Sequence, residues 1–159
     1  MHMKINKFLI FKKKIILILS IFFIFFYSFS SEAKDNKKRE KNMVKMTKIV
    51  IKVDRIFKSG DIDFERLVKI GTQLKKLGIE FPSYSMPDSE RGGSKSSMWT
   101  ERELFLKMNQ DFVDAVDDFI IASAEKNKDE VWTKFKVAFE ECQTCHHKFA
   151  RAKINLLED

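Results

Sequence analysis

Cysteine, proline and glycine are scarce in this sequence of 159 residues, which contains two, two and five of them. Because Cys142 and Cys145 are the only cysteines, no disulfide framework competes for their thiols. Both prolines and the pair Gly92-Gly93 fall in one stretch, 79–97, which is therefore predicted to be a long connection without a helix. The length of the chain predicts one domain.

Several functional patterns are also missing. The sequence has no strand-like alternation and no internal repeat. It has no pair of catalytic carboxylates, no nucleophile with an adjacent base and no phosphate-binding loop, so we do not predict an enzyme. The acidic residues Asp114, Asp117 and Asp118 are interpreted as a solvated helix face.

Residues 1–33 have the order of a secretory signal peptide. Five lysines between Lys4 and Lys14 precede an apolar run over residues 15–27, and small residues then lead to Ala33. We expect cleavage after Ala33, with Ser30 as the alternative, which makes 34–159 the mature domain. The run is shorter than the ~20 residues that span a bilayer, so an uncleaved anchor is the minor alternative. No cysteine stands just after the run, which excludes a lipoprotein signal.

The positive charge of the chain lies largely in this leader. The whole chain has a formal net charge of +7, and the leader carries five Lys and one Glu, a net charge of +4, which leaves +3 for the rest. The basic composition therefore does not predict nucleic-acid binding. We expect a periplasmic protein, tethered to the inner membrane if the leader is retained.

Four amphipathic stripes at helical spacing follow the leader. The first begins near Lys38 and ends at Gly60, and the second begins after Asp61 or Asp63 and ends at Gly78. Gly71, within the second stripe, predicts a close contact between helices.

The other two stripes follow the long connection. The third begins at Ser97 or Thr100, with Thr100 and Glu103 spaced as a capping box, and the fourth begins at Asn127. Four helices with two short connections and one long one predict an all-α fold, an antiparallel four-helix bundle.

The fourth stripe contains a Cys-x-x-Cys-His motif, made by Cys142, Cys145 and His146, which is the attachment signature of haem c. Two cysteines three residues apart share a helix face, where their thiols can meet the two vinyl groups of one porphyrin. His146 projects from the same face toward the iron. We therefore predict haem c, covalently attached through Cys142 and Cys145 and ligated by His146. A haem-free dithiol oxidoreductase and a zinc site are weaker alternatives, because no βαβ unit and no further ligand set accompany the motif.

A haem motif near the C-terminus of the last of four helices resembles the class II c-type cytochromes, the cytochrome c-prime and cytochrome c-556 group. The resemblance runs from about Arg39 to Lys153. It includes the segment from Phe81 through Met98-Trp99 to Phe105, and the pattern that places Phe149 three residues after His146. The resemblance implies a four-helix bundle with haem bound at the C-terminal helix.

The family divides on the second axial position of the iron. In the c-556 branch a methionine from the first helix makes a six-coordinate, low-spin haem that transfers electrons. In the c-prime branch an apolar side chain often blocks that side, and five-coordinate iron binds small gases. Arg39 precedes Met46 by seven residues, as an arginine precedes the axial methionine in c-556, so the resemblance implies His146 and Met46 as metal ligands. Met43 is the main rival, Met108 a weaker one, and a core methionine without ligation is the other interpretation.

Three further residues are assigned to the cofactor site. Arg39 is expected to pair with a haem propionate, with a solvated charge as the alternative. Phe105 and Phe149 are expected to pack on the porphyrin, with core packing as the alternative. The family usually has a basic residue directly after this last aromatic, but Ala150 intervenes before Arg151, so no role is assigned to Arg151.

The sequence thus predicts a periplasmic one-electron carrier, a c-type cytochrome with His/Met iron that exchanges electrons with unidentified redox proteins. The first alternative is a five-coordinate protein that binds nitric oxide or carbon monoxide. The family resemblance also implies a homodimer through the first helices.

Overall fold

The computed structural model describes residues 35–87, 89 and 91–151, and the expected signal peptide lies outside them. The chain divides into a unit of residues 1–34 and a unit of residues 35–159, of which the second contains the described residues. Within the described part, no helix combines the length and apolar character needed to cross a membrane.

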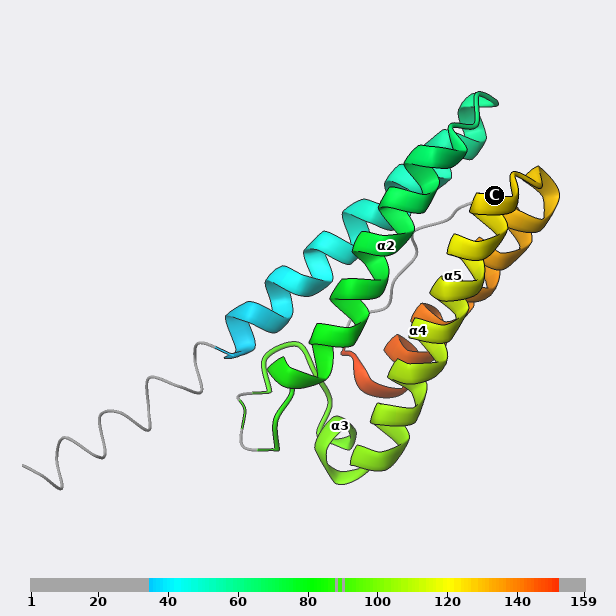
Figure 1. Cartoon of the computed structure of the whole chain (residues 1–159). Helices are drawn as coiled ribbons and strands as arrows, with labels where there is room; N and C mark the ends of the chain where they lie inside the picture. The colour runs from blue at the N-terminus through cyan, green and yellow to red at the C-terminus, as the bar shows by residue number, and fades with distance from the viewer. Residues whose placement is uncertain (1–34, 88, 90, 152–159) are drawn as a thin grey trace, which may run out of the picture. The chain divides into compact units, whose positions relative to one another are not determined.

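The second unit is built from helices (Figure 1). A first long helix covers residues 35–59. It is followed by α2 (Phe64–Glu80), the 3₁₀ helix η1 (Phe81–Tyr84), the one-turn helix α3 (Ser97–Thr100), α4 (Arg102–Glu125) and α5 (Lys128–Phe149). No strand occurs among these residues, where a single antiparallel β-bridge joins Ser94 to Ala150. The predicted all-α, four-helix bundle is confirmed.

Local chemistry explains most helix ends. Gly60 terminates the first helix with φ +77°, a conformation that glycine adopts without a steric penalty. Asp63 caps α2, since its carboxylate accepts a hydrogen bond from the Arg66 amide at 2.9 Å. Asn127 caps α5 in the same way, through the Glu130 amide at 3.3 Å.

Two predicted boundaries are wrong. Helix α2 continues through Gly78 to Glu80, because this glycine serves close packing and not termination. A Cβ at Gly78 would lie 2.9 Å from side-chain atoms of Phe112 and Val113 on α4. The capping box at Thr100 is also absent: α3 and α4 are separate helices, and α4 begins after Glu101 without a side-chain cap.

The main core lies between the four long helices. Its buried residues come from all of them: Val50, Val53, Ile56, Leu67, Ile70, Phe119, Ala122, Val131, Phe135 and Phe139. Gly71 permits the predicted close contact between α2 and α4, since a Cβ there would lie 2.6 Å from Cγ1 of Ile120.

The long connection returns to the C-terminal end of α5. The Lys95 amide donates to the Phe149 carbonyl at 2.7 Å, and Lys95 Nζ donates to the His147 carbonyl at 2.7 Å. The Ser97 hydroxyl donates to the Lys148 carbonyl at 3.2 Å. The connection thereby satisfies carbonyls that a helix end leaves without partners, and it holds the last turn of α5 in place.

Candidate functional site

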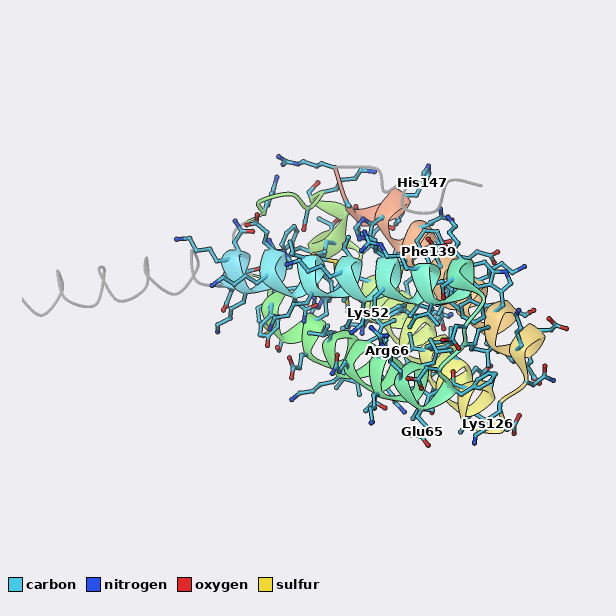
Figure 2. All side chains as sticks on the ribbon, turned by 90° about the horizontal axis from the view of Figure 1, so that it is seen from above. Lys52, Glu65, Arg66, Lys126, Phe139 and His147 are labelled. Atoms are coloured by element: carbon cyan, nitrogen blue, oxygen red, sulfur yellow. The ribbon has the colours of Figure 1, made fainter. Side chains whose placement is uncertain are left out.

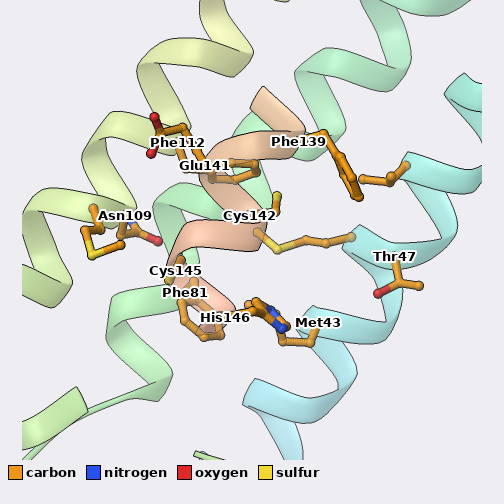
Figure 3. A pocket seen from close by; sticks show the side chains of 13 residues that line it. Met43, Thr47, Phe81, Asn109, Phe112, Phe139, Glu141, Cys142, Cys145 and His146 are labelled. Carbon is orange, nitrogen blue, oxygen red and sulfur yellow. The ribbon is translucent and has the colours of Figure 1, made fainter. Parts of the chain in front are cut away.

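Two neighbouring pockets surround the last turns of α5, and Met43, Phe81, Cys145 and His146 line both. The wider pocket has a volume of about 390 Å³, within the range of cofactor sites, and reaches Ser94 and Ala150. The narrower pocket is lined by Cys142 and by side chains of the first helix and α4 (Figure 3). The Cys-x-x-Cys-His motif therefore lies inside a cavity between helices, the usual place for cofactors in a bundle.

The two cysteines are free thiols, half-buried within this cavity. Burial raises the pKa of the Cys142 thiol to about 12. Burial also raises the pKa of the Cys145 thiol, to about 11, with the nearby Glu141 carboxylate contributing. A redox-active dithiol needs a lowered pKa, because the thiolate is the nucleophile. These surroundings therefore disfavour the dithiol alternative.

The protonation and burial of the His146 side chain are those of a metal ligand. Burial lowers the pKa of the imidazole, which favours the neutral form that binds metals. Its Nδ1 atom is buried and has no hydrogen-bond partner among the described residues. A buried polar atom of this kind needs a partner, so the site fits a cofactor that contains a metal. In the described ranges, no cluster of three or more His, Cys, Asp or Glu is placed to hold a bare metal ion.

The structure brings both methionines of the first helix to the cavity. Met46 is 7% exposed and lines the narrower pocket, where it packs in the same apolar cluster as Cys142. Met43 lines both pockets and packs with Cys145 and Phe81. Figure 3 shows Met43 beside His146. Met108 of α4 also lines the narrower pocket. Met43 is thus placed at least as well as Met46 to reach the iron. Ligation by Met46 therefore stays a prediction.

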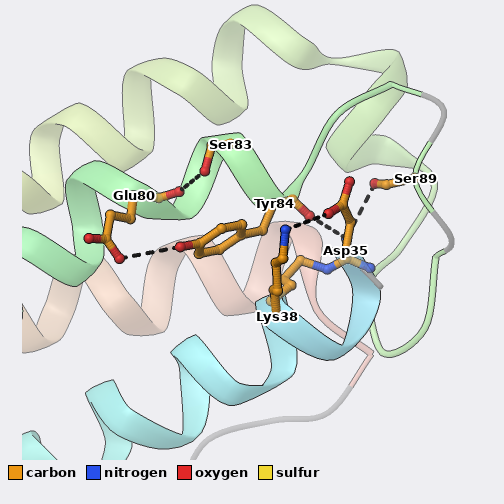
Figure 4. Close-up of polar contacts among 7 residues, drawn as sticks. Asp35, Lys38, Glu80, Ser83, Tyr84 and Ser89 are labelled. Atoms are coloured by element: carbon orange, nitrogen blue, oxygen red, sulfur yellow. Dashed lines mark hydrogen bonds and ion pairs between the residues drawn. The ribbon is translucent and has the colours of Figure 1, made fainter. Parts of the chain in front are cut away.

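Arg39 lines the wider pocket, but its guanidinium also holds the long connection. It donates hydrogen bonds to the Tyr84 carbonyl at 2.9 Å and to the Arg91 carbonyl at 3.0 Å. It also donates a hydrogen bond to the Ser89 hydroxyl at 3.3 Å. Figure 4 shows Tyr84 and Ser89 of this connection near Asp35 of the first helix. The propionate contact therefore stays a prediction, beside a structural role that the sequence did not indicate.

The predicted aromatic residues lie at different depths. Phe149 lines the wider pocket, and Phe105 lies behind it, fully buried, with the two rings edge to face at 5.6 Å. Phe81 lines both pockets and was not predicted. It precedes Pro82 in a stretch without helical periodicity, so only the return of this connection to α5 reveals its role.

Three polar lining residues of the narrower pocket were also missed: Thr47, Asn109 and Glu141. Asn109 is oriented by its Nδ2 atom, which donates to the Gly78 carbonyl at 3.1 Å. Thr47 follows Met46 directly and Glu141 precedes Cys142, so proximity to the predicted ligands was the available signal. Arg151, to which no role was assigned, is exposed, and its amide donates to the Gly93 carbonyl at 3.0 Å.

A family model described as Cytochrome C' matches residues 35–150. The chain belongs to the cytochrome c' family. The cofactor is accordingly haem c with its iron, as the motif predicted. The match supports the class II assignment and does not support the c-556 branch.

Solved structures of cytochrome c' from Alcaligenes xylosoxidans share the fold. The reduced form of an arginine-to-alanine variant has 19% identity and a TM-score of 0.72, covering 76% of this chain and 97% of its own. The nitric oxide complex of a leucine-to-isoleucine variant has 18% identity, a TM-score of 0.72 and the same coverage. At these identities the likeness shows the fold alone. No curated protein matches the chain significantly.

Proposed function

We propose that this chain is a haem c protein whose iron keeps one axial position open for nitric oxide or carbon monoxide. In this proposal Cys142 and Cys145 form the thioether bonds and His146 is the one protein ligand of the iron. When bound, the haem supplies an open coordination position for a diatomic gas.

The apolar character of the narrower pocket carries this proposal. Besides the haem motif, its lining is mostly hydrophobic, with Met43, Met46, Val50 and Phe81 among the contributing residues. Such a surface favours a small uncharged ligand over water or an anion, because it offers few hydrogen-bond partners. Membership of the cytochrome c' family and the nitric oxide complexes of proteins with this fold support the same function.

A second candidate is the six-coordinate one-electron carrier. Met43 and Met46 both line the pocket that contains His146, and a thioether opposite the histidine raises the reduction potential. In either case Arg39 would support the haem through a propionate contact and Phe149 through packing, with Phe105 packed behind Phe149.

The visible spectrum of the reduced holoprotein decides between the two. We expect a high-spin ferrous spectrum that shifts strongly when carbon monoxide is added. Sharp α and β bands with little carbon monoxide shift would overturn the open-position proposal in favour of the carrier. Retention of haem on a denaturing gel tests covalent attachment, and its loss in Cys142→Ser and Cys145→Ser variants tests the assigned residues.

The leader supports a proposal for localisation. Residues 1–33 would export the chain to the periplasm, where covalent haem attachment takes place in bacteria, with a retained leader as an anchor. Redox partner proteins and a homodimer are part of the same proposal. No catalytic role is proposed.

A further inference from the structure

The first helix is much more basic than the rest of the bundle. Residues 35–59 include nine Lys or Arg and three Asp or Glu, whereas Arg102–Glu125 includes two and six. Five of the basic residues form a row at spacings of four, three, four and three: Lys41, Lys45, Lys48, Lys52 and Arg55. This spacing places them on one helix face along ~21 Å, and all five are exposed. We call these five residues the basic row.

The basic row has no acidic partner among the described residues. Elsewhere in the bundle, ion pairs join Lys75 to Asp117 at 2.6 Å and Lys134 to Asp118 at 3.0 Å. No side chain of the basic row forms an ion pair or hydrogen bond with another described residue. Like charges at these spacings repel by a few tenths of a kcal/mol per pair. This face therefore concentrates positive charge that no described acidic side chain neutralises.

One end of the basic row opens into a hollow in the surface. The hollow has a volume of about 810 Å³ and lies between the first helix and the start of α2. Figure 2 shows Lys52 and Arg66 on the same side of the bundle. The charged residues that line the hollow are Lys48, Lys52, Arg55, Arg66, Asp61 and Asp63. The surface is thus concave and of mixed charge at this end, whereas Lys41 and Lys45 lie outside the hollow.

The same helix separates the basic row from the haem site. Its inward face carries Met43 and Met46 into the cavity, and its Glu40 lines the rim of the wider pocket. A partner on the basic row would therefore lie about one helix diameter, ~10 Å, from the cavity.

We infer that the basic row and its hollow form the docking surface for an acidic electron-donor protein that reduces the haem. The inference rests on the proposed function, because nitric oxide and carbon monoxide bind ferrous haem, which must be supplied with an electron. In the step, iron(III) gains one electron, the donor's cofactor loses one, and no bond forms. A protein fits better than an anionic bilayer, because Asp61 and Asp63 within the hollow would repel a uniform layer of phosphates, whereas a patterned protein surface avoids them.

The test compares two triple variants of the haem-loaded protein that change its net charge equally. Lys45→Glu/Lys48→Glu/Lys52→Glu reverses the centre of the basic row. Lys69→Glu/Lys128→Glu/Lys136→Glu is the control, since these exposed lysines lie on α2 and α5 and have no ion pair among the described residues. The probe is fully reduced flavodoxin, a small acidic protein, with its binding measured by biolayer interferometry and its electron transfer by stopped flow.

For the basic-row variant we expect a second-order rate constant at least about tenfold lower at low salt, with binding weakened in parallel. The control should retain most of both, and reduction by uncharged photoreduced lumiflavin should be equal in all proteins. An equal loss in both variants would overturn the inference, because it would reflect net charge alone. Unchanged flavodoxin kinetics would also overturn it, and row-dependent binding to phosphatidylglycerol vesicles would then identify a membrane surface. The carbon monoxide spectrum, recorded separately, reports failure of the proposed gas-binding function.

Discussion

At the scale of single residues, burial keeps the two thiols of the motif protonated and its imidazole neutral in the haem-free protein. Burial raises the pKa of the Cys142 and Cys145 thiols to about 12 and about 11. Burial lowers the pKa of His146, and its Nδ1 lacks a partner within the described residues. Thiols that stay protonated resist oxidation, and a neutral imidazole is ready to bind iron.

The thiols should therefore react slowly in the folded, haem-free protein. At pH 8 we expect alkylation of Cys142 and Cys145 by iodoacetamide to be at least about tenfold slower than in urea, because few thiolates are present. Equal rates in the two conditions would contradict the buried arrangement.

The raised pKa values of the two thiols also make the stability of the haem-free protein depend on pH. Between about pH 9 and pH 11 the unfolded chain loses thiol protons that the folded haem-free chain keeps. Stability is therefore greatest below the unfolded pKa and falls as pH rises through this range. Urea melts of the haem-free protein at pH 8 and pH 10 measure it, and a double Cys→Ser variant should lose this part of the pH dependence.

Volume-conserving substitutions can distinguish the roles of the two methionines of the first helix, Met43 and Met46. We expect Met43→Leu and Met46→Leu to leave the high-spin ferrous spectrum of the holoprotein unchanged, since neither side chain ligates iron in the proposed function. Met108→Leu is the control, because it lines the same pocket from α4. If the unmodified protein is low-spin, the variant that becomes high-spin identifies the ligand.

At the scale of elements, small residues set the distance between helices. The glycines of α2 lie against α4, with Gly71 facing Phe119 and Ile120 and Gly78 facing Phe112 and Val113. Phe112 also lines the narrower pocket, so the spacing of α2 and α4 shapes the cofactor site.

A larger side chain at Gly71 should destabilise the bundle, because it would push α2 away from α4. Gly71→Val would place side-chain atoms where even a Cβ comes within 2.6 Å of Ile120, so we expect a loss of about 1–3 kcal/mol in the free energy of unfolding. Gln73→Val, at an exposed position of the same helix, controls for the helix propensity of valine. Chemical denaturation followed by circular dichroism measures both, and equal effects would contradict a close packing role for Gly71.

At the scale of the whole molecule, charge is distributed unevenly. Residues 1–33 hold much of the formal positive charge, and the first helix of the bundle holds another concentration of it. A two-fold dimer that packed the basic row against itself would bring like charges together. The predicted homodimer therefore needs another face of the first helix, or another helix.

Removal of residues 1–33 should separate folding from cofactor attachment. We expect the shortened chain to stay in the bacterial cytoplasm and to carry no covalent haem, because the attachment machinery lies outside the inner membrane. Haem staining of a denaturing gel compares it with the full chain in the periplasmic fraction. Covalent haem on the shortened chain would contradict the export proposal.

The sequence alone determined the class of the fold and the identity of the cofactor. Helical periodicity depends on neighbouring residues, and caps such as Asp63 and Asn127 act within three residues, so both can be read locally. The haem motif is equally local, since Cys142, Cys145 and His146 share one helical turn.

Only the tertiary structure decided what surrounds the motif. Phe81 enters the site, and Lys95 satisfies the end of α5, because the long connection folds back across the bundle. Gly78, which the sequence presents as a helix end, became a packing contact because α4 passes against it. Met43 and Met46 lie three residues apart and have the same chemistry, so local pattern does not separate them, and the tertiary structure brings both to the cavity around His146. These features depend on contacts between residues that are far apart in the chain. The local sequence pattern does not contain information about such long-range contacts.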